Sequence, residues 1–145
     1  MRNLKNRKGN SIVGYIIIYP ALILFLVYMV VGGAYFMDQN AMLTLSNLSL
    51  DRALVEGTFT NEIYNDLEEK LARKGFSDNL EITIAQSEAR PENESQYVKR
   101  GDIITLQVIN REPHPFYYIN KIFASSVSEE QFYITTTIHG MSEKW

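Results

Sequence analysis

An uncharged apolar stretch near the N-terminus constrains this chain more than any other feature. Residues 11–36 contain no Asp, Glu, Lys or Arg, and the first charge after them is Asp38. A helix rises 1.5 Å per residue, so this stretch reaches roughly 35–40 Å and exceeds a hydrocarbon core of about 30 Å. The sequence therefore predicts a transmembrane helix over residues 11–36.

The charges that flank the span predict its orientation. Residues 1–10 carry Arg2, Lys5, Arg7 and Lys8, and no further Lys or Arg occurs before Arg52. Positive charge stays on the cytoplasmic side of a membrane protein. We therefore expect a basic cytoplasmic tail or leader at residues 1–10 and an outer location for the chain after Asp38.

Two other interpretations of the apolar stretch deserve comparison. A secretory signal peptide has an apolar region of about 7–15 residues, which is shorter than this one. A helix that is apolar on all sides and buried in a soluble core needs a larger protein around it. Ordinary signal cleavage, which would release a secreted binding domain starting near Tyr35, is kept as an alternative.

The composition of the outer part excludes several classes of function. All 17 acidic residues lie at or after Asp38, whereas four of the 14 basic residues lie before the span. An acidic domain does not bind nucleic acid, which requires clustered Lys and Arg. The chain has no cysteine, so disulfides, thiolate metal sites and thiol nucleophiles are excluded.

The segment at residues 37–57 predicts a stalk that continues the membrane helix until Gly57. At 100° per residue its apolar positions form two stripes on nearly opposite sides. The first stripe contains Met37, Ala41, Leu45, Leu48 and Val55; the second contains Phe36, Leu43, Leu50 and Leu54. We expect Leu43, Leu50 and Leu54 to form an assembly face, and Ala41, Leu45 and Leu48 to hold the chain's own sheet.

Residues 58–145 predict a small α+β domain. Residues 58–75 have a helical pattern, with Ile63, Leu67 and Leu71 on one face and Glu69 paired with Arg73. Strand patterns follow at 80–85, at 97–98 with 102–110, and at 131–139, whereas 88–94 and 110–115 predict loops. Residues 116–127 fit either a strand or a short helix. The predicted fold is a transmembrane helix extended into a stalk, a second amphipathic helix and an antiparallel sheet of three or four strands.

No pattern in the sequence indicates catalysis. His114 lies between two prolines, and His139 ends a predicted strand. Zinc needs three or four ligands at recognisable spacing, and no such motif, phosphate loop or nucleophile elbow occurs. We expect no enzyme activity, no catalytic or metal-binding residue and no cofactor.

The two ends of the chain carry a recognisable pattern. A basic segment ends at Gly9, Asn10 follows, and an Ile-rich apolar run with an early Pro20 comes next. This start resembles that of the TadE-like pseudopilins of the tight-adherence pilus. TadE-like proteins, and a related uncharacterised group from bacterial mobile elements, also close with an aromatic loop, a Thr-rich strand and a polar tail, as residues 116–145 do. The family usually has a Glu five residues after the leader Gly, where this chain has Gly14.

The resemblance implies a membrane-anchored structural pseudopilin or minor pilus component in a bacterial cytoplasmic membrane. Its partners would be the lipid bilayer and other pilin-like or secretion-system subunits, including further copies of the chain. The substitution at Gly14 keeps a second interpretation open, an uncleaved single-pass interaction subunit of a conjugation or secretion machine. Cleavage after Gly9 distinguishes the two, because the first would start at Asn10 and the second at Met1.

Overall fold

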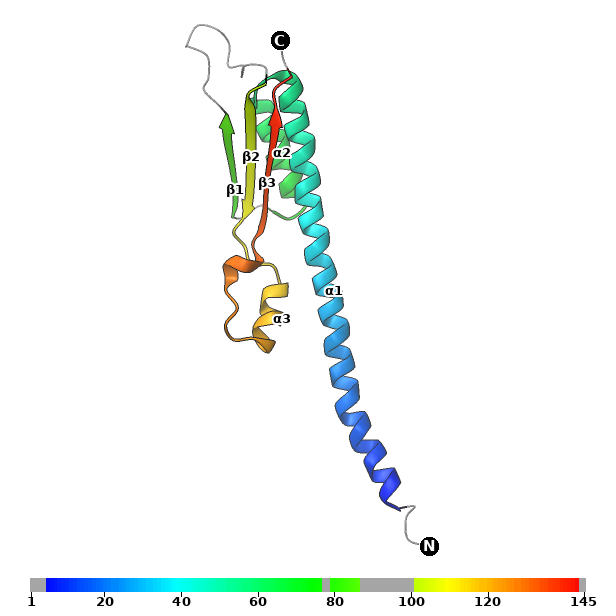
Figure 1. The fold of residues 1–145 in the computed structure, drawn as a ribbon. Coiled ribbons are helices and arrows are strands. Elements are labelled where there is room, and N and C mark those ends of the chain that lie inside the picture. Colours follow the sequence, from blue (N-terminus) through cyan, green and yellow to red (C-terminus); the bar gives the residue numbers. More distant parts are fainter. Residues whose placement is uncertain (1–4, 77–78, 87–100, 144–145) are drawn as a thin grey trace.

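The computed structural model describes residues 5–76, 79–86 and 101–143, with side chains from Gly14 onward. The elements in chain order are α1 (Lys5–Glu56), α2 (Asn61–Arg73), β1 (Leu80–Gln86), β2 (Ile103–Asn110), α3 (Phe116–Phe123), the 3-10 helix η1 (Glu129–Phe132) and β3 (Ile134–Met141). The sheet and α2 pack against the C-terminal part of α1, while α3 and η1 lie beside α1 further toward its N-terminus (Figure 1). This arrangement confirms the predicted α+β fold.

The predicted span and stalk form one continuous helix. α1 contains 52 residues with Pro20 in its interior, and its length at 1.5 Å per residue is roughly 78 Å. The helix ends where Gly57 adopts a φ of 81°, and the N–H of Gly57 donates to the carbonyl of Ala53 at 2.8 Å. A positive φ is inexpensive only for glycine, so Gly57 sets the end of α1 as predicted.

Helix α2 covers one side of the core through the face that its sequence predicts. Ile63, Leu67 and Leu71 are fully buried, and each such side chain contributes about 1.5–3 kcal/mol by leaving water. The Thr60 hydroxyl accepts a hydrogen bond from the N–H of Ile63 and caps the N-terminus. The predicted ion pair between Glu69 and Arg73 is present on the exposed face.

The three strands form an antiparallel sheet in the order β1-β2-β3. Ile104, Leu106 and Val108 of β2 are fully buried toward the helices, as the alternating pattern predicts. β3 begins at Ile134, opposite the last residue of β2, Asn110. The predicted strand at 131–139 therefore starts three residues too early, because the ladder has no partner for residues 131–133.

The segment that fitted either a strand or a helix contains the helix α3. It is followed by a turn and by η1, which returns the chain to the sheet (Figure 1). The predicted loop at residues 88–94 and the predicted strand residues Tyr97 and Val98 lie outside the described residues.

Candidate interaction surfaces

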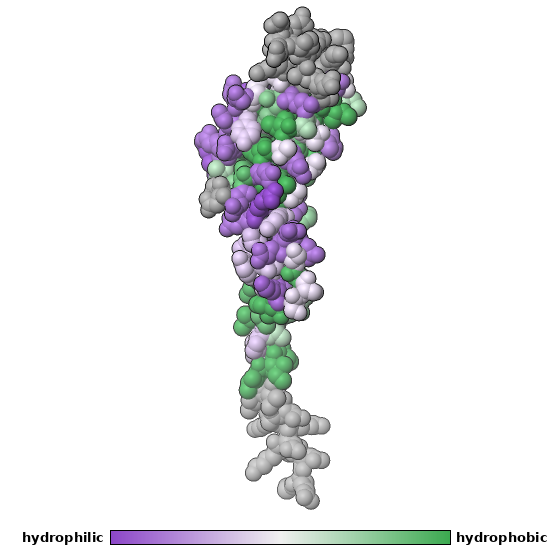
Figure 2. Space-filling view, turned by 90° about the vertical axis from the view of Figure 1, so that its left-hand side faces the viewer, coloured by the Kyte–Doolittle hydropathy of each residue, from purple (hydrophilic) through white to green (hydrophobic). Residues whose placement is uncertain are grey.

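The N-terminal part of α1 exposes apolar side chains, and the rest of the described chain leaves most of them uncovered. An 18-residue window within Gly14–Glu56 has a mean hydropathy of 2.4, and none of it is buried. Large apolar side chains from Tyr15 to Val30 are exposed all round the helix, and hydrophobic residues dominate this part of the surface (Figure 2). A helix of this length and composition is compatible with a membrane anchor.

The stalk part of α1 buries a different face from the predicted one. The residues of α1 that are almost completely buried are Met42, Ser46, Ser49, Leu50 and Ala53. Two of the five are serines, whose small side chains let the helix approach its neighbours closely. An apolar pattern does not mark serines as core positions, and this explains why the predicted faces were misplaced.

Two of the three residues of the predicted assembly face belong to the chain's own core. Leu50 is only 3% exposed. Leu54 packs against the backbone of Gly140 in β3, where any side chain larger than hydrogen would collide with it. Leu43 remains exposed, but the prediction for Leu50 and Leu54 is wrong.

The stalk nevertheless presents a second apolar face. Met37, Leu48 and Val55 are mostly exposed and lie on the side of α1 opposite its buried residues. Their spacing of 11 and then 7 residues corresponds to about three and two helical turns, so they form a stripe along the helix. We call these three residues the outer stripe. Leu48, which the sequence analysis assigned to the sheet, therefore faces outward.

An aromatic cluster fastens α3 and η1 to α1. The ring of Phe116 lies 5.0 Å from that of Tyr28, 5.8 Å from that of Tyr35 and 5.8 Å from that of Phe132. Tilted and offset aromatic pairs at such distances add about 0.5–1.5 kcal/mol each beyond area burial. Phe116 reaches this position because Gly32 has no side chain, since a Cβ there would lie 3.2 Å from the Phe116 ring.

His114 lies at the end of this cluster nearer the sheet and has partners that the sequence does not reveal. Its Nδ1 accepts a hydrogen bond from the N–H of Phe116 at 3.1 Å, and its Nε2 lies 3.4 Å from a carboxylate oxygen of Asp38. The neutral ring therefore carries its proton on Nε2. Burial lowers the pKa of His114, and the charge and hydrogen bond of Asp38 act in the opposite direction.

Acid is expected to loosen the attachment of α3 through His114. Protonation would place a second N–H on Nδ1, where it faces the N–H of Phe116 and breaks that bond. Because the folded pKa is below the ordinary value near 6.5, the stabilisation is complete above pH 6.5 and is lost as pH falls through the lowered pKa. Thermal unfolding in detergent should give a lower Tm at pH 5 than at pH 7.5.

The second histidine provides the matched control for this prediction. His139 lies on the exposed face of β3, with Nδ1 3.0 Å from the hydroxyl of Thr105. His114→Gln should reduce the difference in Tm between the two pH values, whereas His139→Gln should preserve it. An equal change in both variants would contradict the role of His114.

A cavity of about 250 Å³ adjoins His114 and is lined in part by Asp38, Lys74 and Glu112. Among the residues that the structure describes, no three His, Asp or Glu side chains come close enough to share a metal ion. The cavity brings together charges of both signs but no nucleophile with an adjacent base. Its geometry supports a structural contact between α1 and the loop before α3.

The candidate leader residues lie at the opposite end of the molecule from these contacts. Gly9 and Asn10 belong to the first turns of α1, and their side-chain surroundings lie outside the described residues. A Cβ at Gly14 would meet nothing within 4 Å.

Comparison with protein-family models, curated proteins and solved structures finds no match to the chain.

Proposed function

We propose that the protein is a membrane-anchored structural subunit of the pseudopilin type, in a bacterial surface-appendage or secretion system. One observation carries this proposal. A single continuous helix exposes apolar residues all round its N-terminal part, binds its own domain on one side of its C-terminal part and shows the outer stripe on the other. An anchor alone requires no outer stripe.

The outer stripe has the form of a helix-packing surface. Single exposed apolar residues are ordinary on proteins, but Met37, Leu48 and Val55 share one face of a rigid rod. A second helix laid along this face would bury all three, with the smaller Ala41 between them. Further copies of α1, or the equivalent helix of a related subunit, have the required length and apolar character.

The proposed orientation places the basic N-terminal tail in the cytoplasm and the sheet domain outside. The charge distribution supports it, because the basic tail precedes the anchor and all acidic residues follow it. No enzymatic step is part of this proposal. The protein would act by packing, with lipid around its anchor and neighbouring subunits along its stalk.

Gly14 favours a second candidate, an uncleaved single-pass subunit of a conjugation or secretion machine. In type IV pilins the Glu at the corresponding position contributes to subunit docking, and Gly14 offers no such carboxylate. The N-terminus of the protein from membranes decides between the two: Asn10 indicates a pseudopilin, Met1 a permanent anchor. Cleavage near Tyr35 is disfavoured, because it would separate Tyr28 and Gly32 from the Phe116 ring that they contact.

Crosslinking between single cysteines tests the proposed assembly, and the absence of native cysteine makes the result unambiguous. Cysteines at positions 37, 48 and 55 are expected to crosslink between subunits when a membrane-impermeant bismaleimide is added to intact cells whose wall has been removed. Cysteines at the buried positions 42 and 53 serve as controls and should not react. Failure of all three stripe positions to crosslink would contradict assembly through this face.

A separate measurement tests the orientation in the same cells. A membrane-impermeant monofunctional maleimide should label a cysteine at position 83, which is exposed on the sheet and lies outside the outer stripe, whether or not subunits assemble. Labelling without crosslinking would leave the orientation intact and remove the assembly. Complete protection from both reagents, together with labelling after lysis, would place the domain on the inner side instead.

A further inference from the structure

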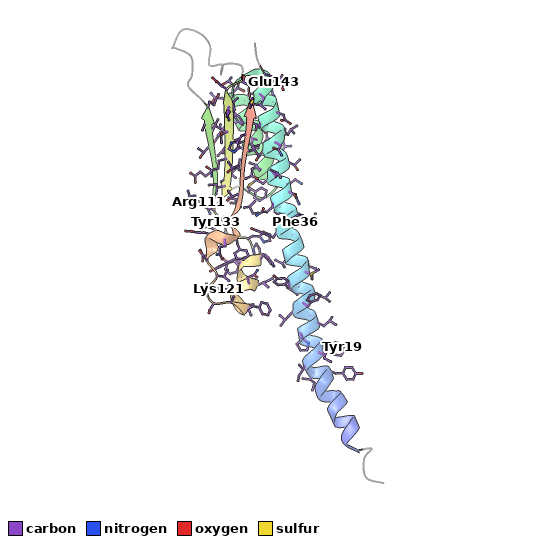
Figure 3. The ribbon with its side chains drawn as sticks, viewed as in Figure 1. Tyr19, Phe36, Arg111, Lys121, Tyr133 and Glu143 are labelled. Carbon is purple, nitrogen blue, oxygen red and sulfur yellow. The ribbon has the colours of Figure 1, made fainter. Side chains whose placement is uncertain are left out.

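Helix α3 exposes apolar side chains at the same level as the anchor. Tyr118, Ile122 and Phe123 are 58%, 73% and 62% exposed. α3 lies below the sheet and alongside α1, with Lys121 on its outer surface (Figure 3). The packing of the sheet domain leaves these three side chains uncovered, although they are among the largest apolar groups outside α1.

The position of α3 along α1 can be compared with the extent of the membrane. The uncharged stretch runs from residue 9 to residue 37, and a hydrocarbon core of about 30 Å takes up only about 20 of these residues. Every window of that length contains residues 18–28. The Phe123 ring lies 6.5 Å from the ring of Tyr28, so the end of α3 lies beside a residue that is in or at the edge of the core in every placement.

A groove separates the end of α3 from α1. It has a volume of about 470 Å³ and is lined by Ala21, Leu24, Phe25 and Tyr28 of α1 and by Asn120 and Phe123 of α3. The one polar side chain of α3 in this lining, Asn120, already donates to the carbonyl of Phe116 at 2.8 Å. The walls therefore offer mainly apolar contact.

Other features limit how deeply α3 can enter the membrane. The turn after α3 contains Ser125 and Ser126, and its irregular backbone needs water or lipid headgroups as hydrogen-bond partners. The ammonium group of Lys121, which lies 5.2 Å from the centre of the Tyr117 ring, is a charge that belongs in the polar layer rather than among the acyl chains. These groups place α3 at the boundary between headgroups and acyl chains. The core then takes up the N-terminal part of the uncharged stretch, near residues 9–28.

We propose that α3 is an interfacial membrane helix, that it inserts Ile122 and Phe123 among the outer-leaflet lipids, and that the groove between α3 and α1 holds a phospholipid acyl chain. This inference rests on the membrane anchor of the proposed function. Lipid is the expected occupant because the groove walls are continuous with the exposed apolar surface of the anchor. Whatever surrounds the anchor also reaches the groove.

Depth-dependent fluorescence quenching tests the proposal in the full-length protein. The chain has one tryptophan, Trp145, so a Trp145→Phe background carries a new tryptophan as Phe123→Trp or, at the most exposed position of α3, as Ile122→Trp. Each variant is reconstituted into phosphatidylcholine–phosphatidylglycerol vesicles whose chains are brominated near the headgroup or near the terminal methyl. Ile17→Trp reports the anchor, and Thr83→Trp reports the exposed sheet face.

Both α3 probes should show blue-shifted emission and lose most of their fluorescence to bromine near the headgroup, with less loss to bromine near the methyl end. Ile17→Trp should show the reverse preference, and Thr83→Trp should be unaffected. Unquenched α3 probes beside a quenched Ile17 probe would overturn the inference and leave the anchor intact. Blue-shifted but unquenched α3 probes would overturn it in favour of a second protein copy, and stronger quenching from the methyl end would overturn the interfacial depth. An unquenched Ile17 probe would refute the anchor and, with it, the proposed function.

Discussion

Leu50→Ala is expected to lower the free energy of unfolding of the α+β domain by about 2–5 kcal/mol. Leu50 is only 3% exposed and belongs to the hydrophobic core. Truncation removes buried methyl groups and leaves a cavity that the surrounding helices and strands can fill only in part. The expected loss is a large fraction of the total stability of a small domain.

Leu48→Ala is the matched control, because the same residue type is changed two positions away on the same helix. Leu48 is 57% exposed, and a surface substitution of this kind changes stability by roughly 0.5 kcal/mol or less. Urea unfolding of both variants in detergent, followed by near-ultraviolet circular dichroism, gives the comparison. A larger loss at Leu48 would restore the faces that the sequence predicts, and equal losses would mean that both leucines belong to the domain's own core.

This pair of leucines shows where the sequence was informative about the stalk and where it was not. An apolar pattern correctly predicts that α1 has two faces, since Leu48 and Leu50 point in very different directions. It does not tell which face meets the sheet, because Ser46 and Ser49 take core positions beside Leu50. The assignment depends on how closely the helix approaches its neighbours, which is a property of the packed structure.

Local patterns sufficed for the elements whose periodicity is strong. The uncharged run, the buried face of α2 and the alternation in β2 each follow from the order of residues within one element. The start of β3 was predicted too early, because its first paired residue, Ile134, is fixed by the end of β2 at Asn110. That limit comes from a partner strand rather than from the residues of β3.

The contacts around His114 could not be predicted from local sequence patterns either, because they too depend on another part of the chain. Asp38, at the start of the stalk, and His114, in the loop before α3, are far apart in the chain, and only the path of α3 along α1 brings them together. The sequence analysis identified no partner residues for His114. What the sequence did not reveal was that Phe116 packs against Gly32, a contact that depends on the absence of a side chain at Gly32.

Gly32→Leu is therefore expected to release α3 from α1. The Cβ of any larger residue would lie 3.2 Å from the Phe116 ring, so the ring has to move, and the three further carbon atoms of leucine increase the crowding. Overpacking of this kind costs about 1–3 kcal/mol. If that cost is borne by local opening of α3 and η1, hydrogen exchange of their amides should accelerate by roughly 5- to 150-fold.

Gly33→Leu is the control that separates the loss of the Phe116 contact from the other effects of replacing a glycine in α1. A Cβ at Gly33 would meet nothing within 4 Å, yet the substitution adds the same apolar surface and the same helix propensity to α1. Exchange measured by mass spectrometry on peptides from residues 116–132 should therefore stay slow in Gly33→Leu and become fast in Gly32→Leu. Peptides from β2 should be unchanged in both variants, because the core of the α+β domain lies away from this contact. Similar exchange in the two variants would show that the Phe116 ring does not hold α3 on the helix, and the aromatic cluster would then lose its role in placing α3 at the membrane surface.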